Sequence, residues 1–162
     1  MPSESFRTSV GAGVTTLLRR RVLVRLPIQA YRVGAGWMFG SRLLLLHHTG
    51  RRSGRTRHVV LEVIGGTPPD TAVVMSGFGE RAQWYRNVKV DPRVLVSIGR
   101  LRDRPALVRV LSADEARSVL VEYRRHHPHT WSWIRVVLER SLGQTVTVDD
   151  APPVVEFRLD GS

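Results

Sequence analysis

The sequence contains no cysteine among its 162 residues. Disulfide bonds, thiolate nucleophiles, iron–sulfur clusters and cysteine-ligated zinc sites are therefore excluded, and nothing in the chain requires an oxidising compartment. A long uninterrupted apolar run is also missing near the N-terminus, because Arg25, Pro27 and Arg32 break the first apolar segment. The hydrophobic core of a signal peptide would not tolerate these residues. We therefore expect a cytoplasmic protein.

Lysine is almost absent as well, since Lys89 is the only one in a chain with 25 basic and 14 acidic residues and a net charge of +11. Arginine is the side chain best suited to bidentate binding of phosphate or carboxylate groups, so the excess suggests an anionic partner. The hydrophobic content of 42% is typical of a globular protein. The length fits one domain, and we expect a single one over residues 1–162.

Residues 14–40 are expected to form a basic N-terminal helical segment. Apolar residues recur there at roughly helical spacing, with Pro27 and the Gly34–Gly36 pair as breaks. A basic helix with an apolar face can lie on an anionic membrane surface, such as the inner face of the cell membrane. Solvated arginines on a helix packed against the domain are the more common arrangement. Both alternatives stay open.

Short apolar runs separated by turn residues predict a series of antiparallel strands. The expected strands cover residues 43–47, 59–64, 72–76, 94–99, 104–111 and 152–160, with a protruding loop at 100–103. Expected helices cover residues 79–91, 112–125 with a capping box at its start, and 130–143 with a glycine at its end. The predicted fold class is α+β, a small barrel of about six mainly antiparallel strands with flanking helices.

Arginines gather between the first two expected strands. The stretch TGRRSGRTR places Arg51, Arg52, Arg55 and Arg57 within seven residues, together with Ser53 and two glycines that allow a turn. The spacing is neither that of a P-loop nor that of a dinucleotide-binding turn. Because four neighbouring arginines repel one another, we expect the loop to bind an anion. A polyanionic small molecule, a phosphorylated cofactor tail and a nucleic-acid backbone all remain candidates.

A second cluster, SGFGERAQWYRN, follows the third expected strand. Its glycines would bend the chain so that backbone N–H groups could face a ligand. Ser76, Trp84, Tyr85 and Asn87 add hydroxyl, ring and amide groups. For Trp84, plain core packing is as good an interpretation as ligand contact.

Together these stretches resemble the deazaflavin-dependent nitroreductases, also described as F420H2-dependent quinone reductases. LLLLHHTGRRSGRTRHVVLEV and VVMSGFGERAQWYRNVKVDPRVLVSIG contain the family's T-G-R-[RK]-S-G-x-x-R and W-Y-x-N motifs in order, across residues 43–99, and Ser76-Gly77 stands between them where the family has S-x-G at a strand end. The resemblance implies a split β-barrel similar to the pyridoxamine-phosphate-oxidase-like proteins. It also implies coenzyme F420, whose phospholactyl and oligoglutamate tail is polyanionic, with FMN as the alternative cofactor.

The resemblance further implies roles for individual residues. The residues expected to hold the phosphate and the tail carboxylates are Arg51, Arg52, Ser53 and Arg57. Those expected to flank the deazaflavin ring and its phosphate are Ser76, Gly77, Trp84, Tyr85 and Asn87. Ser76 is the expected catalytic residue, which would polarise an oxygen of an electron-poor acceptor (quinone, enone or nitro compound) that takes a hydride from F420H2. Related barrels are often dimers, so we expect a homodimer.

In this family, tyrosines near the C-terminus close the substrate pocket, and they cannot be matched one by one here. The comparable stretch, YRRHHPHTWSWIRVV, offers Tyr123, His126, Trp131 and Trp133 as candidate walls. The acceptor is therefore left open.

The histidines and the tryptophans bear on other functions. The histidines fit no standard ligand spacing, so no metal is expected. A basic barrel could follow a nucleic-acid backbone, but the tryptophans lie in expected helices rather than among basic strands, so no nucleic acid is expected. A split barrel that binds a lipid or a flavin, or that acts in a pathway without F420, stays as the alternative.

Overall fold

The computed structural model describes residues 35–160, except for the side chains of residues 36 and 37. Most of the expected helical segment at residues 14–40 therefore lies outside the described residues. Within 35–160, no helix has both the length and the apolar character needed to cross a membrane.

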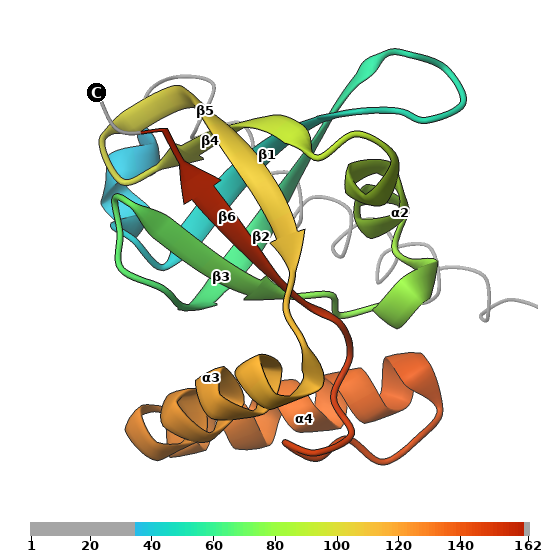
Figure 1. Cartoon of the computed structure of the whole chain (residues 1–162). Helices are drawn as coiled ribbons and strands as arrows, with labels where there is room; N and C mark the ends of the chain where they lie inside the picture. Colours follow the sequence, from blue (N-terminus) through green and yellow to red (C-terminus); the bar gives the residue numbers. More distant parts are fainter. Residues whose placement is uncertain (1–34, 161–162) are drawn as a thin grey trace, which may run out of the picture.

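Six strands form a closed barrel, which confirms the predicted α+β barrel (Figure 1). They are β1 (Leu43–Thr49), β2 (Thr56–Gly65), β3 (Thr71–Met75), β4 (Arg93–Ile98), β5 (Leu101–Val110) and β6 (Val154–Leu159). Their order around the barrel is β1-β2-β3-β6-β5-β4, and every neighbouring pair is antiparallel. Closure removes the exposed edges that an open sheet would leave.

The largest differences from the predicted strand boundaries are the starts of β2 and β5. β2 begins at Thr56 rather than at residue 59, because the ladder with β1 continues past the core into exposed backbone. No protruding loop exists at 100–103, since Ile98 pairs directly with Leu101 across a two-residue turn. Gly99 has a φ of +57°, which glycine adopts without strain and which lets the turn be this short.

The helices also match the prediction in place but not in every boundary. A short 3-10 turn, η1 (Ala35–Phe39), precedes the barrel, and the expected helix at 79–91 is divided into η2 (Gly79–Arg81) and α2 (Gln83–Val90) by the extended residue Ala82. α3 (Ala113–His126) begins with the predicted capping box of Ser112 and Glu115. α4 (Pro128–Leu142) begins two residues earlier than expected, because proline suits the first turn of a helix, and ends at Gly143.

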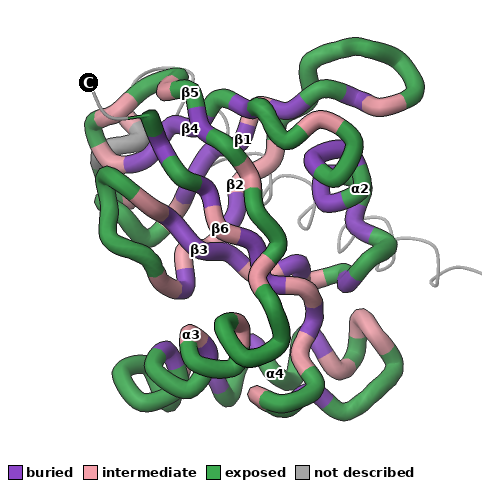
Figure 2. Tube along the Cα trace, in the orientation of Figure 1, coloured by how far each residue is buried: buried purple, intermediate pink, exposed green. Residues whose placement is uncertain are grey.

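The core has two parts, on the two faces of the barrel wall (Figure 2). Alternate residues of a strand face opposite sides, so Val74 packs inside the barrel while Val73 packs outward against α3 and α4. Trp131 and Leu120 belong to this outer core, which holds the two helices below the barrel in Figure 1. Trp84 and Tyr85 of α2 belong to the barrel core.

Candidate cofactor pocket

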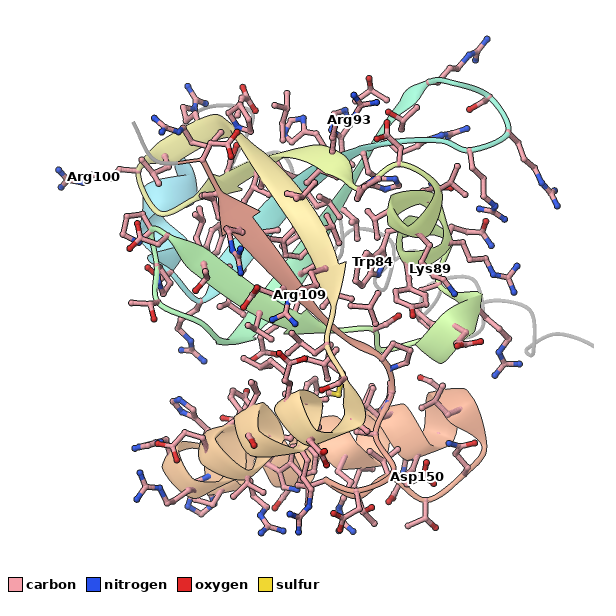
Figure 3. All side chains as sticks on the ribbon, in the orientation of Figure 1. Trp84, Lys89, Arg93, Arg100, Arg109 and Asp150 are labelled. Atoms are coloured by element: carbon pink, nitrogen blue, oxygen red, sulfur yellow. The ribbon has the colours of Figure 1, made fainter. Side chains whose placement is uncertain are left out.

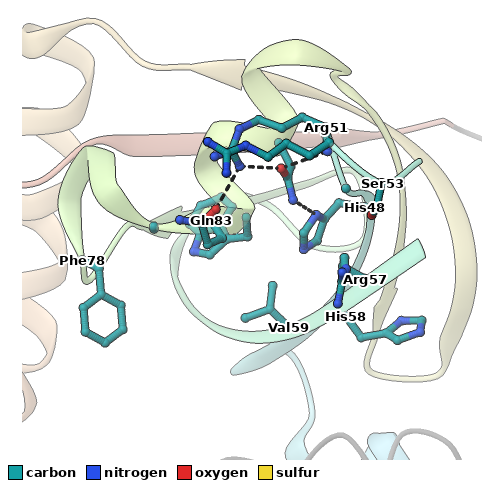
Figure 4. A pocket seen from close by; sticks show the side chains of 13 residues that line it. His48, Arg51, Ser53, Arg57, His58, Val59, Phe78 and Gln83 are labelled. Carbon is teal, nitrogen blue, oxygen red and sulfur yellow. Dashed lines mark hydrogen bonds between the residues drawn. The ribbon is translucent and has the colours of Figure 1, made fainter. Parts of the chain in front are cut away.

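A pocket of about 510 Å³ lies between the β1–β2 loop, the start of β2 and the η2–α2 segment (Figure 4). Its charged and polar lining includes Arg51, Arg52, Ser53, Arg57, Gln83 and Asn87. Its apolar lining is Val59, Phe78, Ala82 and the ring of Trp84. In Figure 4, Phe78 lies on the opposite side of the pocket from Ser53 and Arg57. The pocket therefore combines a cationic side with an apolar side.

The glycines of the β1–β2 loop hold it in a tight turn. Gly50 N–H donates to the Arg55 carbonyl at 2.8 Å, and Gly54 N–H donates to the Gly50 carbonyl at 2.8 Å. A Cβ at Gly50 would lie 2.7 Å from Ser53 Oγ, and Gly54 has a φ of +64°. Side chains at either position would disturb the turn. This compact loop presents Arg52 and Ser53 exposed to solvent at the pocket.

A hydrogen-bond network ties the loop to α2 and β1. Arg51 donates to Asn87 Oδ1 twice, from its backbone N–H at 3.2 Å and from Nη1 at 2.9 Å. Arg51 Nη1 also donates to Gln83 Oε1 at 3.0 Å. The other end of the Asn87 amide, Nδ2, lies 3.0 Å from Nδ1 of His48. Asn87 and His48 are only 5% and 6% exposed, so this part of the network is shielded from water.

His48 is kept neutral by its surroundings. Burial is the main cause that lowers the pKa of its imidazole to about 4; electrostatic repulsion from His58, Arg57 and His47 lowers it further, against a hydrogen bond with the Thr49 backbone that raises it. Register places His48 directly opposite Arg57 on the paired strands β1 and β2. Near neutral pH the imidazole is therefore uncharged and one of its ring nitrogens is free to accept a hydrogen bond.

The structure brings six of the residues expected from the resemblance to this pocket: Arg51, Arg52, Ser53, Arg57, Trp84 and Asn87. Three others do not line it. Ser76 is completely buried, its Oγ donating to the Gly79 carbonyl at 2.7 Å. Gly77 lies beside it in the chain, and Tyr85 lines a different pocket together with Arg81, Leu142 and Pro152. Burial and Glu80 raise the pKa of the Tyr85 hydroxyl.

The candidate walls from the C-terminal region lie elsewhere. Trp131 is in the outer core, and the Tyr123 hydroxyl donates a hydrogen bond of 3.0 Å to Glu62 Oε1 on β2. His126 is exposed beside Glu122, and Trp133 is 68% exposed on α4. None of the four lines the cofactor pocket or the pocket next to Tyr85.

Seven lining residues were not among those expected: His48, Gly50, His58, Val59, Phe78, Ala82 and Gln83. The sequence could have predicted the inward direction of His48, because it shares the strand face of Leu44 and Leu46, which are buried inside the barrel. No sequence pattern could have predicted that Phe78 and Gln83 line the pocket, since their positions depend on the bend between η2 and α2. Among residues 35–160, no three His, Asp or Glu side chains converge in the way a metal site requires.

The closed antiparallel barrel and its arginine-lined pocket define a barrel protein with an anion-binding cofactor site. The chain belongs to the F420H(2)-dependent quinone reductase family, whose sequence model matches residues 18–147. It is accordingly an F420H2-dependent oxidoreductase, and coenzyme F420 is its cofactor.

Individual relatives agree with this family. Rv3178 of Mycobacterium tuberculosis, provisionally named an F420H(2)-dependent quinone reductase, is 36% identical over 87 residues, which cover 52% of this chain and 71% of that protein. Among solved structures, an F420-H2 dependent reductase (FDR-A) is similar with a TM-score of 0.50 and 23% identity, covering 72% of this chain and 94% of that one. A domain-swapped dimer has a TM-score of 0.54 and 19% identity, covering 89% and 98%. At these identities the structures show a shared fold.

Proposed function

We propose that the pocket binds F420H2 with the anionic tail at Arg52, Ser53 and Arg57 and with the deazaflavin ring against Val59, Phe78 and Trp84. The observation that supports this is the convergence of six residues, expected from separate motifs, on one pocket with a cationic and an apolar side. Guanidinium groups bind phosphate and carboxylate with paired donors, and the apolar side suits a flat ring system. The residues present therefore fit the cofactor.

When bound, the reduced deazaflavin supplies the hydride. The chain binds and orients it. Arg52 and Arg57 are exposed and hold the tail, while Val59, Phe78 and Trp84 exclude water from the ring and leave one apolar surface for an acceptor. We propose a flat, electron-poor acceptor, such as a quinone, enone or nitro compound, because that surface offers stacking rather than charge.

The polarising role expected for Ser76 stays a prediction. Its hydroxyl donates to the Gly79 carbonyl, and its backbone N–H donates to the Pro153 carbonyl at 2.9 Å. To polarise an acceptor oxygen, Ser76 would have to exchange the first of these bonds. The geometry favours a positioning role, in which Ser76 holds the bend that presents Phe78 to the pocket.

The proposal is tested by fluorescence titration of the purified protein with F420, with FMN and with a short DNA duplex at two salt concentrations. Micromolar or tighter binding of F420 alone is expected. Tight, salt-dependent binding of DNA with no F420 binding would favour a nucleic-acid module. Absence of F420 binding, together with tight FMN binding or co-purified lipid, would favour a barrel repurposed for another ligand.

We further propose that the chain forms a homodimer, which the domain-swapped dimer of the same fold supports. Sedimentation of the purified protein at several concentrations tests this, and a monomer at every concentration would contradict it. Contact of the basic N-terminal segment with an anionic membrane, on the cytoplasmic face, is a separate proposal. Co-sedimentation with anionic vesicles, compared with neutral vesicles, tests that contact.

A further inference from the structure

The orientation of the Asn87 amide is determined by Arg51. Both groups that Arg51 directs at Asn87, its backbone N–H and its guanidinium, can only donate hydrogen bonds. The amide must therefore turn its oxygen to Arg51, and a flipped amide would set its NH2 against two donors. The NH2 group is consequently left facing His48.

The same logic determines the tautomer of His48. Because Asn87 Nδ2 is a donor, Nδ1 of His48 must accept the hydrogen bond across 3.0 Å, and the ring proton must lie on Nε2. A proton on Nδ1 would set two donors, the ring N–H and the amide NH2, against each other. The lone pair on His48 thus prevents the flip of Asn87, and the oxygen of Asn87 keeps Arg51 in place.

We propose that His48 is a positioning residue for cofactor binding, which acts through Asn87 to hold Arg51 and the anion-binding loop in their binding conformation. This inference rests on the proposed function of the pocket. It links three elements: His48 on β1, Asn87 on α2, and Arg51 in the loop. The Gln83 amide supports the same guanidinium from the preceding turn of α2.

His47 provides a matched control from the neighbouring position. It lies on the other side of β1, where its Nε2 is 3.3 Å from Asp103 Oδ1 and its ring meets the ring of His58 edge to face. It does not line the pocket and makes no hydrogen bond with Asn87. Removal of His47 therefore removes an imidazole from the same strand without removing a hydrogen bond of the network.

The test measures the dissociation constant of F420 in a double-mutant cycle. His48→Leu removes the acceptor and should weaken binding about tenfold, because a buried amide donor loses its partner. His48→Asn, whose Oδ1 can take the place of Nδ1, should stay within about threefold of the parent, as should His47→Leu. In an Arg51→Ala background, His48→Leu should add little further loss. An equal loss in both backgrounds, or no loss in either, would overturn the proposal.

A second measurement needs no cofactor. Nitrogen-15 NMR of the histidine rings reports which nitrogen carries the proton, and we expect His48 to be protonated on Nε2 alone at neutral pH. In Asn87→Leu this preference should weaken. A proton on Nδ1 in the unsubstituted protein would overturn the proposal, even if His48→Leu failed to fold. If the protein bound no F420 but kept the Nε2 tautomer, the proposed function would fail while the network itself stood.

Discussion

Acidification should destabilise the fold through His48. Its pKa is lowered from 6.5 to about 4 by burial first, and then by His58, Arg57 and His47. The unfolded chain therefore takes up a proton at a higher pH than the folded chain does. Stability that is fully present above pH 6.5 is lost progressively as the pH falls towards the folded pKa.

The expected size follows from that difference. Between the two pKa values each pH unit costs about 1.4 kcal/mol for a single group, so His48 alone should reduce the free energy of unfolding by about 2 kcal/mol at pH 5. Even a folded pKa one unit higher would leave most of this effect at pH 5. A loss of this size is a substantial fraction of the roughly 5–15 kcal/mol that stabilises an ordinary domain.

The assay is urea unfolding of the parent and of His48→Asn at several pH values between 7 and 4.5, with the slope of the transition checked at each. Because carboxylates titrate in the same range, only the difference between the two proteins isolates His48. The parent should lose stability faster than the variant by about 2 kcal/mol at pH 5. His129→Asn, at an exposed position, should follow the parent. Parallel curves for the parent and His48→Asn would refute the argument.

Three further outcomes are expected. The double variant Arg52→Ala, Arg57→Ala should weaken F420 binding by about 1.5 kcal/mol or more per side chain and should reduce the salt dependence of binding. Arg100→Ala, at the side of the barrel opposite α2 in Figure 3, should do neither. Equal losses of affinity would indicate a general charge effect. Ser76→Ala should lower stability by about 1–3 kcal/mol in urea unfolding; a lower turnover at unchanged stability and F420 affinity would instead support the polarising role. Gly66→Ala should reduce the free energy of unfolding by more than about 1 kcal/mol, since Gly66 has a φ of +98° and a Cβ there would lie 2.7 Å from the Thr71 carbonyl oxygen. An unchanged melting temperature would contradict this prediction.

The barrel could be predicted from the sequence because its signals are local. Each strand is a short apolar run with turn residues at its ends, and the capping box at Ser112 and the final Gly143 set helix boundaries by chemistry within a few residues. Errors arose where a boundary depended on pairing rather than on composition. β2 extends to Thr56 only because β1 offers it a partner there.

Only the local features of the pocket could be predicted from the sequence. The arginine loop stands out as a cluster in the sequence, and the W-Y-x-N motif marks the element that meets it. The direction of each side chain depends on geometry that one segment does not determine. Trp84 and Tyr85 are adjacent on α2, yet one lines the cofactor pocket and the other lines its neighbour, because successive side chains of a helix point about 100° apart around its axis.

The neutrality of His48 limits charge repulsion in a pocket that Arg51, Arg52 and Arg57 line. A charged imidazole beside Arg57 would add repulsion in a buried place, where water cannot screen it. The fold instead keeps the buried side chains of Asn87 and His48 neutral and hydrogen-bonded, and holds the Arg51 guanidinium against Asn87 and Gln83. The remaining arginines of the pocket, Arg52 and Arg57, are exposed. An anion can then bind at the rim with its partners already arranged, while the buried amide and imidazole hold the loop against the mutual repulsion of its arginines.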